Sequence, residues 1–586
     1  MKYTLKYFRP YIPLILLVVC VLFGQAMCEL ALPGYMSDII NNGIVKGDMD
    51  YIRKTGIIMI VVAFGSMAFA VGAGALASRA SAASSRDIRK SLFSKVTSFG
   101  DAEMDRFSTA SLITRSTNDV QMVQQASVMI LRMALFAPIM GIGALIKALR
   151  TSTGLTWTIA LALGVILCIM LVVFFLVMPK FKKLQKLLDR LNLIIGERLS
   201  GLLVIRAFNS ESVEEDRYDK TNKDLTKINT FTNRIMSFMF PAIMVVMNLV
   251  NVMIVWFGSK LIDTQDLMIG DMLAFLQYAM QIIMSFLVIT MMFIMVPRAV
   301  VSGNRIGEVL AVEPSVKDRT DAGNMAGKSV NAGSPAGEIK FENVSFAYPD
   351  AGDETLSGID FTARPGQTTA IIGCTGSGKS SLISLIPRFY DVTYGTITLD
   401  GIDIRNMSQS QLRSQIGFVP QKGLLFSGTI RSNLAFGKSS ATEEEMLKAA
   451  ETAQALPFIK ALPEKLDTPV AQGGTSVSGG QKQRLSIARA LIKKPPVLIF
   501  DDSFSALDFR TDAALRKSLK KNYAGSTKII VAQRINTIMD ADQILVMDEG
   551  RIVGAGTHRE LLRSCPVYKE IAGSQLSEEE LRKEEA

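Results

Sequence analysis

The chain has 586 residues, of which 49% are hydrophobic and only 20% are charged. This composition excludes a disordered or collagen-like protein, and the length exceeds what a single hydrophobic core usually holds, so we expect several domains. The 64 Lys and Arg residues outnumber the 54 Asp and Glu residues by 10. Such a basic excess indicates either nucleic acid as a partner or, in an apolar chain, cytoplasmic loops beside membrane spans. The five scattered cysteines and the single histidine, His558, predict no disulfide framework, zinc site or histidine-based catalytic triad.

The first half of the chain contains six apolar runs of roughly 20 residues, the length that crosses a hydrocarbon core of about 30 Å. They cover residues 12–32, 56–76, 128–149, 155–178, 236–258 and 272–296. We therefore predict an all-α transmembrane domain over residues 1–310. Six spans also exclude the soluble DNA-acting protein that the basic excess could suggest, so we expect a lipid bilayer and no nucleic acid among the partners.

Basic residues gather on one side of these spans. They precede the first span and follow the second and the fourth, which by the positive-inside rule places the N-terminus and everything after the sixth span in the cytoplasm. The first run could be mistaken for a cleaved signal peptide. Its removal would leave five spans, which cannot keep both the basic loops and the C-terminal half inside, so we predict a multi-pass membrane protein.

Two of the segments between spans are long and nearly free of Gly and Pro. Residues 77–127 and 179–235 are rich in helix formers, and long connections without breakers are usually helical. We expect spans two to five to continue as helices for tens of ångströms beyond the membrane.

The composition shifts to Gly, Ala, Ser, Asp and Pro over residues 311–337, which is typical of a linker. Beyond it, residues 338–573 show strands and helices of an α/β domain, and residues 574–586 form an acidic tail for which a solvated segment is the simplest interpretation. A buried strand at 369–372 is followed by Gly-Cys-Thr-Gly-Ser-Gly-Lys-Ser at 373–380 and then by an apolar helix.

This strand, loop and helix match the pattern of a phosphate-binding loop. An ordinary glycine-rich turn is the alternative, but the flanking strand and helix argue against it. In a phosphate-binding loop the backbone N–H groups surround the phosphates, Lys379 neutralises their charge and Ser380 is a ligand of Mg²⁺.

Two further segments could contribute to such a site. A strand at 496–500 ends in Asp501 and Asp502, and a carboxylate at that place suits Mg²⁺, although many such pairs are only turns. The sequence Ser-Gly-Gly-Gln at 478–481 opens an amphipathic helix, where it is either a plain N-cap or a second anion site.

Taken together and in this order, these segments resemble the nucleotide-binding domain of ATP-binding cassette (ABC) proteins. The six spans before a single such domain are similar to a half-size exporter of the type IV fold, whose two intracellular loops match residues 111–120 and 201–208. The resemblance implies that ATP is held by Tyr348, which stacks on adenine, and by Gly373, Cys374, Thr375, Gly376, Ser377, Gly378, Lys379, Ser380, Ser381, Gln421, Ser478, Gly479, Gly480 and Gln481. It also implies Ser380, Gln421 and Asp501 as the residues that hold Mg²⁺.

Three positions depart from the family pattern. Asp502 stands where rapidly hydrolysing members have the glutamate that acts as general base. Gln533 occupies the switch position, which is a histidine in those members. Gln472 replaces a glutamate that precedes the signature, the segment Ser478–Gln481. An aspartate carboxylate falls about 1.5 Å short of the attacking water, and glutamine cannot become cationic. We therefore expect a degenerate catalytic pair, Asp502 and Gln533, and slow hydrolysis, whereas tolerated drift with retained activity is the alternative.

In this family two nucleotide-binding domains enclose two ATP molecules. Each ATP lies between the Walker residues of one domain, here the loop at 373–380 with Asp501 and Asp502, and the signature of the other domain. An intact signature beside altered Walker residues favours a heterodimer with a second ABC half-transporter. The expected function is ATP-driven export of a small hydrophobic or amphipathic substrate, in a bacterial inner or plasma membrane. The alternatives are an ATP-gated regulatory or channel-like subunit and a self-sufficient homodimeric exporter.

Polar residues within the spans are costly unless they face protein or water, and they are candidates for the substrate path. They are Glu29, Arg132, Asn248, Asn251, Gln277 and Gln281, with Glu29 and Arg132 as a possible pair. Methionines in the fifth and sixth spans favour either helix packing or an adaptable cavity.

Overall fold

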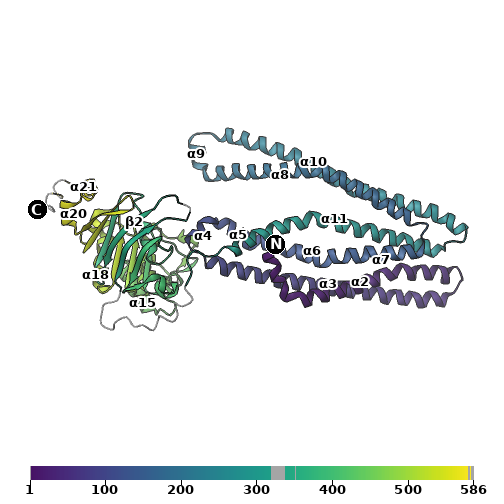
Figure 1. The fold of residues 1–586 in the computed structure, drawn as a ribbon, viewed down its shortest axis with the longest axis horizontal. Coiled ribbons are helices and arrows are strands. Elements are labelled where there is room, and N and C mark those ends of the chain that lie inside the picture. Colours follow the sequence, from purple (N-terminus) through teal and green to yellow (C-terminus); the bar gives the residue numbers. More distant parts are fainter. Residues whose placement is uncertain (1, 319–336, 350, 578–580, 582–586) are drawn as a thin grey trace. The chain divides into compact units, whose positions relative to one another are not determined.

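The computed structural model describes residues 2–318, 337–349, 351–577 and 581. The chain divides into two compact units (Figure 1). One contains Met1–Thr97 with Ala110–Ala311, and the other contains Ser98–Thr109 with Val312–Ala586. The second unit therefore includes a short segment that precedes the third span in the chain.

The first unit consists of long helices, six of which have the length and apolar character to cross a membrane. The six-span prediction is thereby confirmed. The helices are α1 (Lys2–Leu5), η1 (Lys6–Tyr11), α2 (Ile12–Asp38), η2 (Ile39–Ile44), α3 (Met49–Thr97), α5 (Thr109–Thr114), η3 (Arg115–Asp119), α6 (Val120–Met129), η4 (Ile130–Ala134), α7 (Leu135–Thr151), α8 (Thr156–Ser200), α9 (Leu202–Ala207), α10 (Glu211–Asp263) and α11 (Ile269–Ala311). Three short stretches, η2, η3 and η4, are π-helical turns.

Four of these helices are much longer than a membrane is thick. Helix α3 has 49 residues, α8 has 45, α10 has 53 and α11 has 43. At 1.5 Å per residue each is about 65 to 80 Å long, against a hydrocarbon core of about 30 Å. The segments at 77–97 and 179–200 are continuous with their spans, as the scarcity of helix breakers predicted.

The helices of this unit have apolar side chains both in their packed interfaces and on their exposed surface. Small residues on α3, including Ala73, Ala77 and Ala80, are fully buried and allow close packing against neighbouring helices. On the outside Phe64, Val71 and Phe175 expose 64%, 67% and 71% of their surface. Such exposure is unfavourable in water, so this surface requires a lipid environment or protein partners.

The second unit is built around a six-stranded sheet with the order β12-β11-β3-β10-β9-β6. Strand β12 is antiparallel to β11, and the other strands run parallel to their neighbours. The strands are β3 (Thr368–Gly373), β6 (Ile416–Val419), β9 (Val497–Asp501), β10 (Thr527–Val531), β11 (Gln543–Asp548) and β12 (Arg551–Gly556). Since β3, β10 and β9 are adjacent and parallel, their carboxyl ends meet at one edge, where ligands bind in such sheets.

Two smaller sheets complete the strands of this unit. An antiparallel sheet has the order β2-β1-β4-β5, and β7 pairs with β8. The strands are β1 (Ile339–Phe346), β2 (Leu356–Ala363), β4 (Tyr394–Leu399), β5 (Ile402–Asp403), β7 (Gly428–Thr429) and β8 (Pro469–Val470). The α/β architecture predicted for this half of the chain is confirmed.

Helices cover the main sheet, so its central strands are buried on both faces and read as continuous apolar runs. The helices are α4 (Asp101–Arg106), α12 (Lys379–Leu385), η6 (Ile404–Asn406), α13 (Gln409–Ser414), α14 (Ile430–Ala435), α15 (Glu443–Thr452), α16 (Leu456–Ala461), η7 (Lys465–Asp467), η8 (Gln472–Gly474), α17 (Gly479–Leu491), α18 (Phe509–Asn522), α19 (Ile535–Ile538), α20 (His558–Ser564) and α21 (Pro566–Gly573). In strand β9, Leu498, Ile499 and Phe500 are fully buried.

Helix α4 belongs to the second unit although it precedes the third span. The Glu103 carboxylate is 6% exposed and accepts hydrogen bonds from the N–H groups of Gly100 and Ser315, each at 2.8 Å. Burial alone would raise the pKa of Glu103, but these two N–H groups lower it overall. The part of the first intracellular segment that joins this unit is thus 98–109, N-terminal to the stretch at 111–120 that the family resemblance pointed to.

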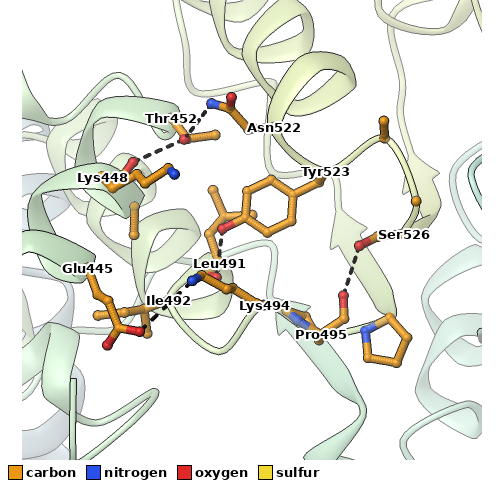
Figure 2. A pocket seen from close by; sticks show the side chains of 14 residues that line it. Glu445, Lys448, Thr452, Leu491, Ile492, Lys494, Pro495, Asn522, Tyr523 and Ser526 are labelled. Atoms are coloured by element: carbon orange, nitrogen blue, oxygen red, sulfur yellow. Dashed lines mark hydrogen bonds and ion pairs between the residues drawn. The ribbon is translucent and has the colours of Figure 1, made fainter. Parts of the chain in front are cut away.

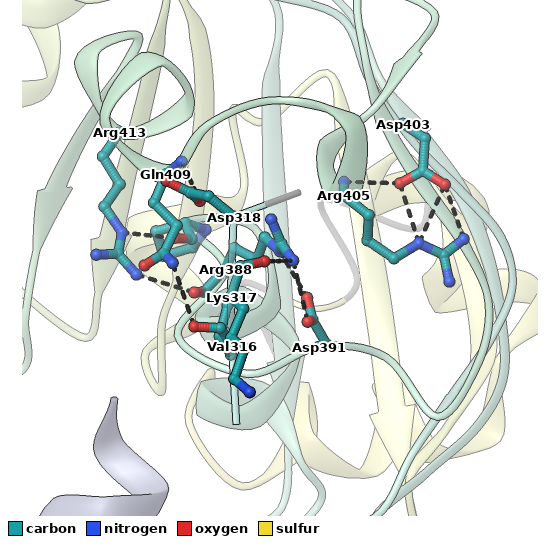
Figure 3. A network of polar contacts seen from close by, with 10 residues as sticks. Val316, Lys317, Asp318, Arg388, Asp391, Asp403, Arg405, Gln409 and Arg413 are labelled. Atoms are coloured by element: carbon teal, nitrogen blue, oxygen red, sulfur yellow. Dashed lines mark hydrogen bonds and ion pairs between the residues drawn. The ribbon is translucent and has the colours of Figure 1, made fainter. Parts of the chain in front are cut away.

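The first residues of the expected linker are held against the second unit (Figure 3). The guanidinium of Arg388 donates to the carbonyl of Lys317 at 3.1 Å and forms a bidentate ion pair with Asp391 at 2.6 and 3.1 Å. The side-chain amide of Gln409 donates to the carbonyl of Val316 at 3.3 Å. The remainder of the expected linker, residues 319–336, lies outside the described residues.

Candidate functional site

The loop between β3 and α12 contains the predicted phosphate-binding residues. The Lys379 ammonium donates to the carbonyls of Gly373 at 2.8 Å and Cys374 at 2.6 Å, so the side chain folds back over the loop. Two positions admit only glycine. A Cβ at Gly373 would lie 2.1 Å from the carbonyl oxygen of Met547, and Gly378 has a φ of +93° with Leu356 only 2.7 Å from the added atom.

Burial lowers the pKa of Lys379, while the nearby carboxylates of Asp502 and Asp501 act in the opposite direction. Desolvation disfavours an ammonium that has no anion beside it, and a bound phosphate would compensate this cost. The loop is therefore suited to a negatively charged ligand.

Ser380 and Asp501 are brought together at the sheet edge. The Ser380 hydroxyl donates to the Asp501 carboxylate at 3.2 Å. Burial raises the pKa of Asp501, and the bond from Ser380 opposes that shift. Both side chains offer the oxygen ligands that Mg²⁺ prefers, and the side-chain carbonyl of Gln421 is a third such oxygen, so the residues fit a magnesium ion.

Asp502 contacts Gln533, the second residue of the altered pair, and also Gln421. Its Oδ2 accepts a hydrogen bond from the Gln533 amide at 2.9 Å and another from the Gln421 amide at 3.3 Å. The residue is 7% exposed, and burial raises the pKa of its carboxyl. Its backbone has a φ of +44° and donates to the carbonyl of Val531 at 3.0 Å.

Tyr348 lies next to the helix that follows the phosphate-binding loop. Its hydroxyl shares a hydrogen bond of 2.8 Å with the hydroxyl of Ser381. Its ring contacts Phe346 and Tyr390 edge to face, with centroids 4.9 and 5.2 Å apart. These contacts fix the ring beside helix α12, and its stacking on adenine stays a prediction.

The signature residues form the start of helix α17. The Ser478 hydroxyl accepts from the N–H of Gln481 at 3.3 Å, and the Gln481 side chain accepts from the N–H of Ser478 at 2.9 Å. This reciprocal capping box fixes the start of the helix and leaves Gly479 and Gly480 in its first turn. One set of hydrogen bonds joins the loop to Asp501, and a second joins Asp502 to Gln421 and Gln533. The capping bonds of the signature lie between Ser478 and the first turn of α17.

Sequence reasoning missed one contact with the switch. The side chain of Gln575, beyond the last helix, binds the backbone of Gln533 and Ile535 at 2.8 and 2.9 Å. A hydrogen bond between a side chain and backbone groups about 40 residues away creates no motif in the sequence. The role of Gln575 therefore has no sequence signal.

The polar residues of the spans are only partly brought together. The Glu29 carboxylate accepts from the Gln25 amide at 2.9 Å and from the Ser66 hydroxyl at 3.3 Å. Arg132 lies instead beside Gly74, with its guanidinium carbon 3.9 Å from the position of an added Cβ. The suggested pair of Glu29 and Arg132 is wrong, because Ser66 and Gly74 are separated by two turns of α3.

A cavity of about 520 Å³ lies elsewhere in the second unit (Figure 2). It is lined by the ends of α15, α17 and α18, including Glu445, Leu491 and Tyr523. The Tyr523 hydroxyl donates to the carbonyl of Leu491 at 2.8 Å. No residue predicted to bind ATP lines this cavity, so it is separate from the candidate site.

Comparison with known proteins agrees with this geometry. Residues 14–286 match the family model of the ABC transporter transmembrane region, and residues 356–505 match that of ABC transporters. An uncharacterized ABC transporter ATP-binding protein of Mycobacterium tuberculosis (strain ATCC 25618 / H37Rv) is 38% identical over 97% of both chains. A mitochondrial potassium channel ATP-binding subunit of Rattus norvegicus is 33% identical over 83% of this chain and 67% of its own length.

A solved structure shows the same fold over nearly the whole chain. The structure of a bacterial Atm1-family ABC exporter with ATP bound superposes with a TM-score of 0.79 and 25% identity, and it covers 97% of this chain and 99% of its own. The chain therefore belongs to the ABC transporters, and it has the fold of an Atm1-family exporter.

Proposed function

We propose that this chain is one half of a heterodimeric ABC exporter that moves hydrophobic or amphipathic compounds across a cell membrane. Its own Walker residues bind ATP and Mg²⁺ and hydrolyse ATP slowly, and its signature, Ser478–Gln481, completes the active ATP site of the partner. The observation that carries this proposal is that one oxygen of the short Asp502 carboxylate, Oδ2, accepts hydrogen bonds from the amides of both Gln421 and Gln533.

A general base needs a free lone pair within hydrogen-bond distance of the attacking water. The backbone of Asp502 is fixed by its bond to Val531, and one of its carboxylate oxygens already accepts two amide hydrogens. Because aspartate is one methylene shorter than glutamate, the carboxylate cannot extend to compensate. Gln533 can donate a hydrogen bond to a γ-phosphate, but it cannot supply a positive charge.

The binding residues are in contrast complete. Lys379 faces the phosphates, Ser380 and Asp501 hold Mg²⁺, Gln421 links the metal to the rest of the site, and Tyr348 stacks on adenine. When bound, Mg²⁺ offsets the charge of the phosphates. Tight binding with slow turnover is the behaviour of a site that holds two subunits together, and the intact signature then serves the partner.

The spans contain a polar cluster suited to one end of an amphipathic substrate. The donors of Gln25 and Ser66 are used by the Glu29 carboxylate, and the amide of Gln281 donates to the Glu29 carbonyl at 3.4 Å. The side-chain oxygen of Gln281 is buried and has no partner among the described residues. A cluster with a carboxylate and a spare acceptor favours a hydrogen-bond donor, such as an ammonium group, as the polar end.

Steady-state ATP turnover of the purified chain in lipid tests the proposal. We expect near-zero turnover with micromolar or tighter ATP binding, and recovery of a second six-span ABC chain when the tagged protein is purified from its own cells. Brisk turnover by the chain alone would contradict the proposal and would favour a self-sufficient homodimeric exporter.

The relative named as an ATP-binding subunit of a mitochondrial potassium channel favours a second candidate. In that case ATP binding would gate a conformation without net pumping, which retained binding residues and impaired catalysis also allow. Flux in sealed vesicles separates the two: an exporter accumulates substrate against its gradient when ATP is added, whereas a gated pathway only equilibrates it.

A further inference from the structure

The side chain of Gln575 joins the C-terminal segment to the backbone of the switch. Its Nε2 donates to the carbonyl of Gln533 at 2.8 Å, and its Oε1 accepts from the N–H of Ile535 at 2.9 Å. The two bonds flank Arg534. One planar amide therefore holds two peptide groups at a fixed separation.

The switch needs this support because it lies beyond the sheet. Strand β10 ends at Val531, and the N–H of Ala532 makes the next bond to the sheet, to the carbonyl of Ile371 at 3.1 Å. Helix α19 begins at Ile535, and Arg534 supplies no side-chain cap. Since the first N–H groups of a helix have no partner within it, the Gln575 carbonyl serves as the cap from outside.

The segment that carries Gln575 is itself anchored. Leu576 is 9% exposed and packs in the same apolar core as Ile535, which is fully buried. The N–H groups of Gln575 and Leu576 both donate to the carbonyl of Ala572, at 3.0 and 2.9 Å. The amide of Gln575 thus extends from a buried anchor, although the residue itself is exposed.

We propose that Gln575 is a positioning residue of the ATP site. It holds the Gln533 backbone so that the Gln533 amide, which lies 2.9 Å from Asp502, can also reach the terminal phosphate of ATP. The inference rests on the proposed role of Gln533 at that phosphate. Because ADP lacks the terminal phosphate, loss of Gln575 weakens the binding of ATP and leaves the binding of ADP unchanged.

The experiment compares ATP and ADP affinities of the full-length chain in lipid nanodiscs by displacement of a fluorescent nucleotide. For Gln575→Ala we expect ATP to bind about tenfold more weakly, the loss of one hydrogen bond to a charged group, with ADP affinity within about twofold and an unchanged unfolding temperature. Gln575→Glu, which keeps the acceptor for Ile535 but not the donor to Gln533, gives most of the same loss.

Two controls separate positioning from general stability. Ser574→Ala alters the neighbouring residue, whose hydroxyl donates to Ile571 at 2.8 Å, and leaves both affinities unchanged. Gln533→Ala weakens ATP binding by itself, and adding Gln575→Ala to it produces little further loss, because both changes remove the same contact.

Equal weakening of ATP and ADP together with a lower unfolding temperature would show that Gln575 is only structural. If Gln533→Ala impairs ATP binding and Gln575→Ala does not, this inference falls while the proposed function stands. If Gln533→Ala itself has no effect on ATP, the proposed role of the switch falls, and this inference falls with it.

Discussion

The phosphate-binding loop and the pair formed by Asp502 and Gln533 lie at the same edge of one sheet, yet they are built differently. The loop depends on backbone geometry, with Gly373 and Gly378 at positions that no larger residue fits. The pair depends on side-chain length and charge, and both of its residues depart from the family pattern. If the proposed function is right, binding depends on the loop and hydrolysis on the pair, so that one can be altered while the other is kept.

The largest effect is expected at the loop. Lys379→Ala removes the cation that faces the phosphates, and ATP affinity should fall by about two orders of magnitude, the loss of about 3 kcal/mol from a charge-assisted contact. Equilibrium nucleotide binding measures it. Lys494→Ala, which removes the same charge from a side chain that is 65% exposed beside the separate cavity, is the matched control and should change nothing.

The pair offers the second test. Asp502→Glu combined with Gln533→His restores the residues of rapidly hydrolysing relatives, and we expect ATP turnover to rise by roughly one to two orders of magnitude while ATP affinity stays the same. Each single change should achieve less than the double one. An unchanged rate in the double variant would show that something other than this pair limits turnover.

The pH dependence of the contribution of Mg²⁺ to ATP affinity offers a third test. Burial raises the pKa of Asp501 and of Asp502, so both lose their charge at a higher pH than an exposed aspartate, whose pKa is about 3.9. Only the charged form of Asp501 is a good metal ligand, so the gain in ATP affinity that Mg²⁺ provides should decline as the pH falls through the raised pKa of Asp501.

Titrations of ATP with and without Mg²⁺, from about pH 8 down to about pH 4, measure this gain. In Asp501→Asn the gain should be small at every pH. A gain in this variant that still declines with acidity would assign the titrating group to the nucleotide itself.

The smallest effect is expected from Tyr348→Phe. The change removes the hydrogen bond to Ser381 but keeps the ring and its contacts with Phe346 and Tyr390. A net loss of about 1 kcal/mol or less in the free energy of unfolding and an ATP affinity within about threefold should follow. Tyr348→Ala removes the ring as well, and it should weaken ATP markedly more if the ring stacks on adenine.

Much of this architecture is predictable from sequence for identifiable reasons. Spans follow from apolar length, and a motif such as Gly373–Ser380 follows from the few ways in which a backbone can surround a phosphate. The positions of Asp502 and Gln533 in the motifs follow from their neighbours in the chain, whereas their catalytic role stays a prediction. Their mutual hydrogen bond at 2.9 Å was not predicted, since it depends on how the ends of β9 and β10 are spaced.

Other features were beyond reach for physical reasons. The π-helical turn over Arg115–Asp119 has no local sequence signal, and its buried Asp119 accepts a hydrogen bond from the distant Ser302 at 2.8 Å. Glu29 accepts a hydrogen bond from Ser66 and does not pair with Arg132. This choice depends on how far α2 and α3 are shifted along their axes, which the apolar periodicity does not determine. Gln575 binds only backbone atoms of Gln533 and Ile535. Any residue type at those two positions could make the same bonds, so the sequence does not reveal the contact.

The assignment of Ser98–Thr109 to the second unit has a consequence for how such chains can be recombined. A chimera joined just after the membrane helices, near residue 312, would inherit an ATPase domain without Glu103, which caps the N–H of Ser315, and without Ala102, which packs on its core. The borrowed domain would have to accept the corresponding segment of a foreign chain. Exchange of the ATPase domain between relatives should therefore succeed most often when the segment Ser98–Thr109 of the donor chain is transferred together with it.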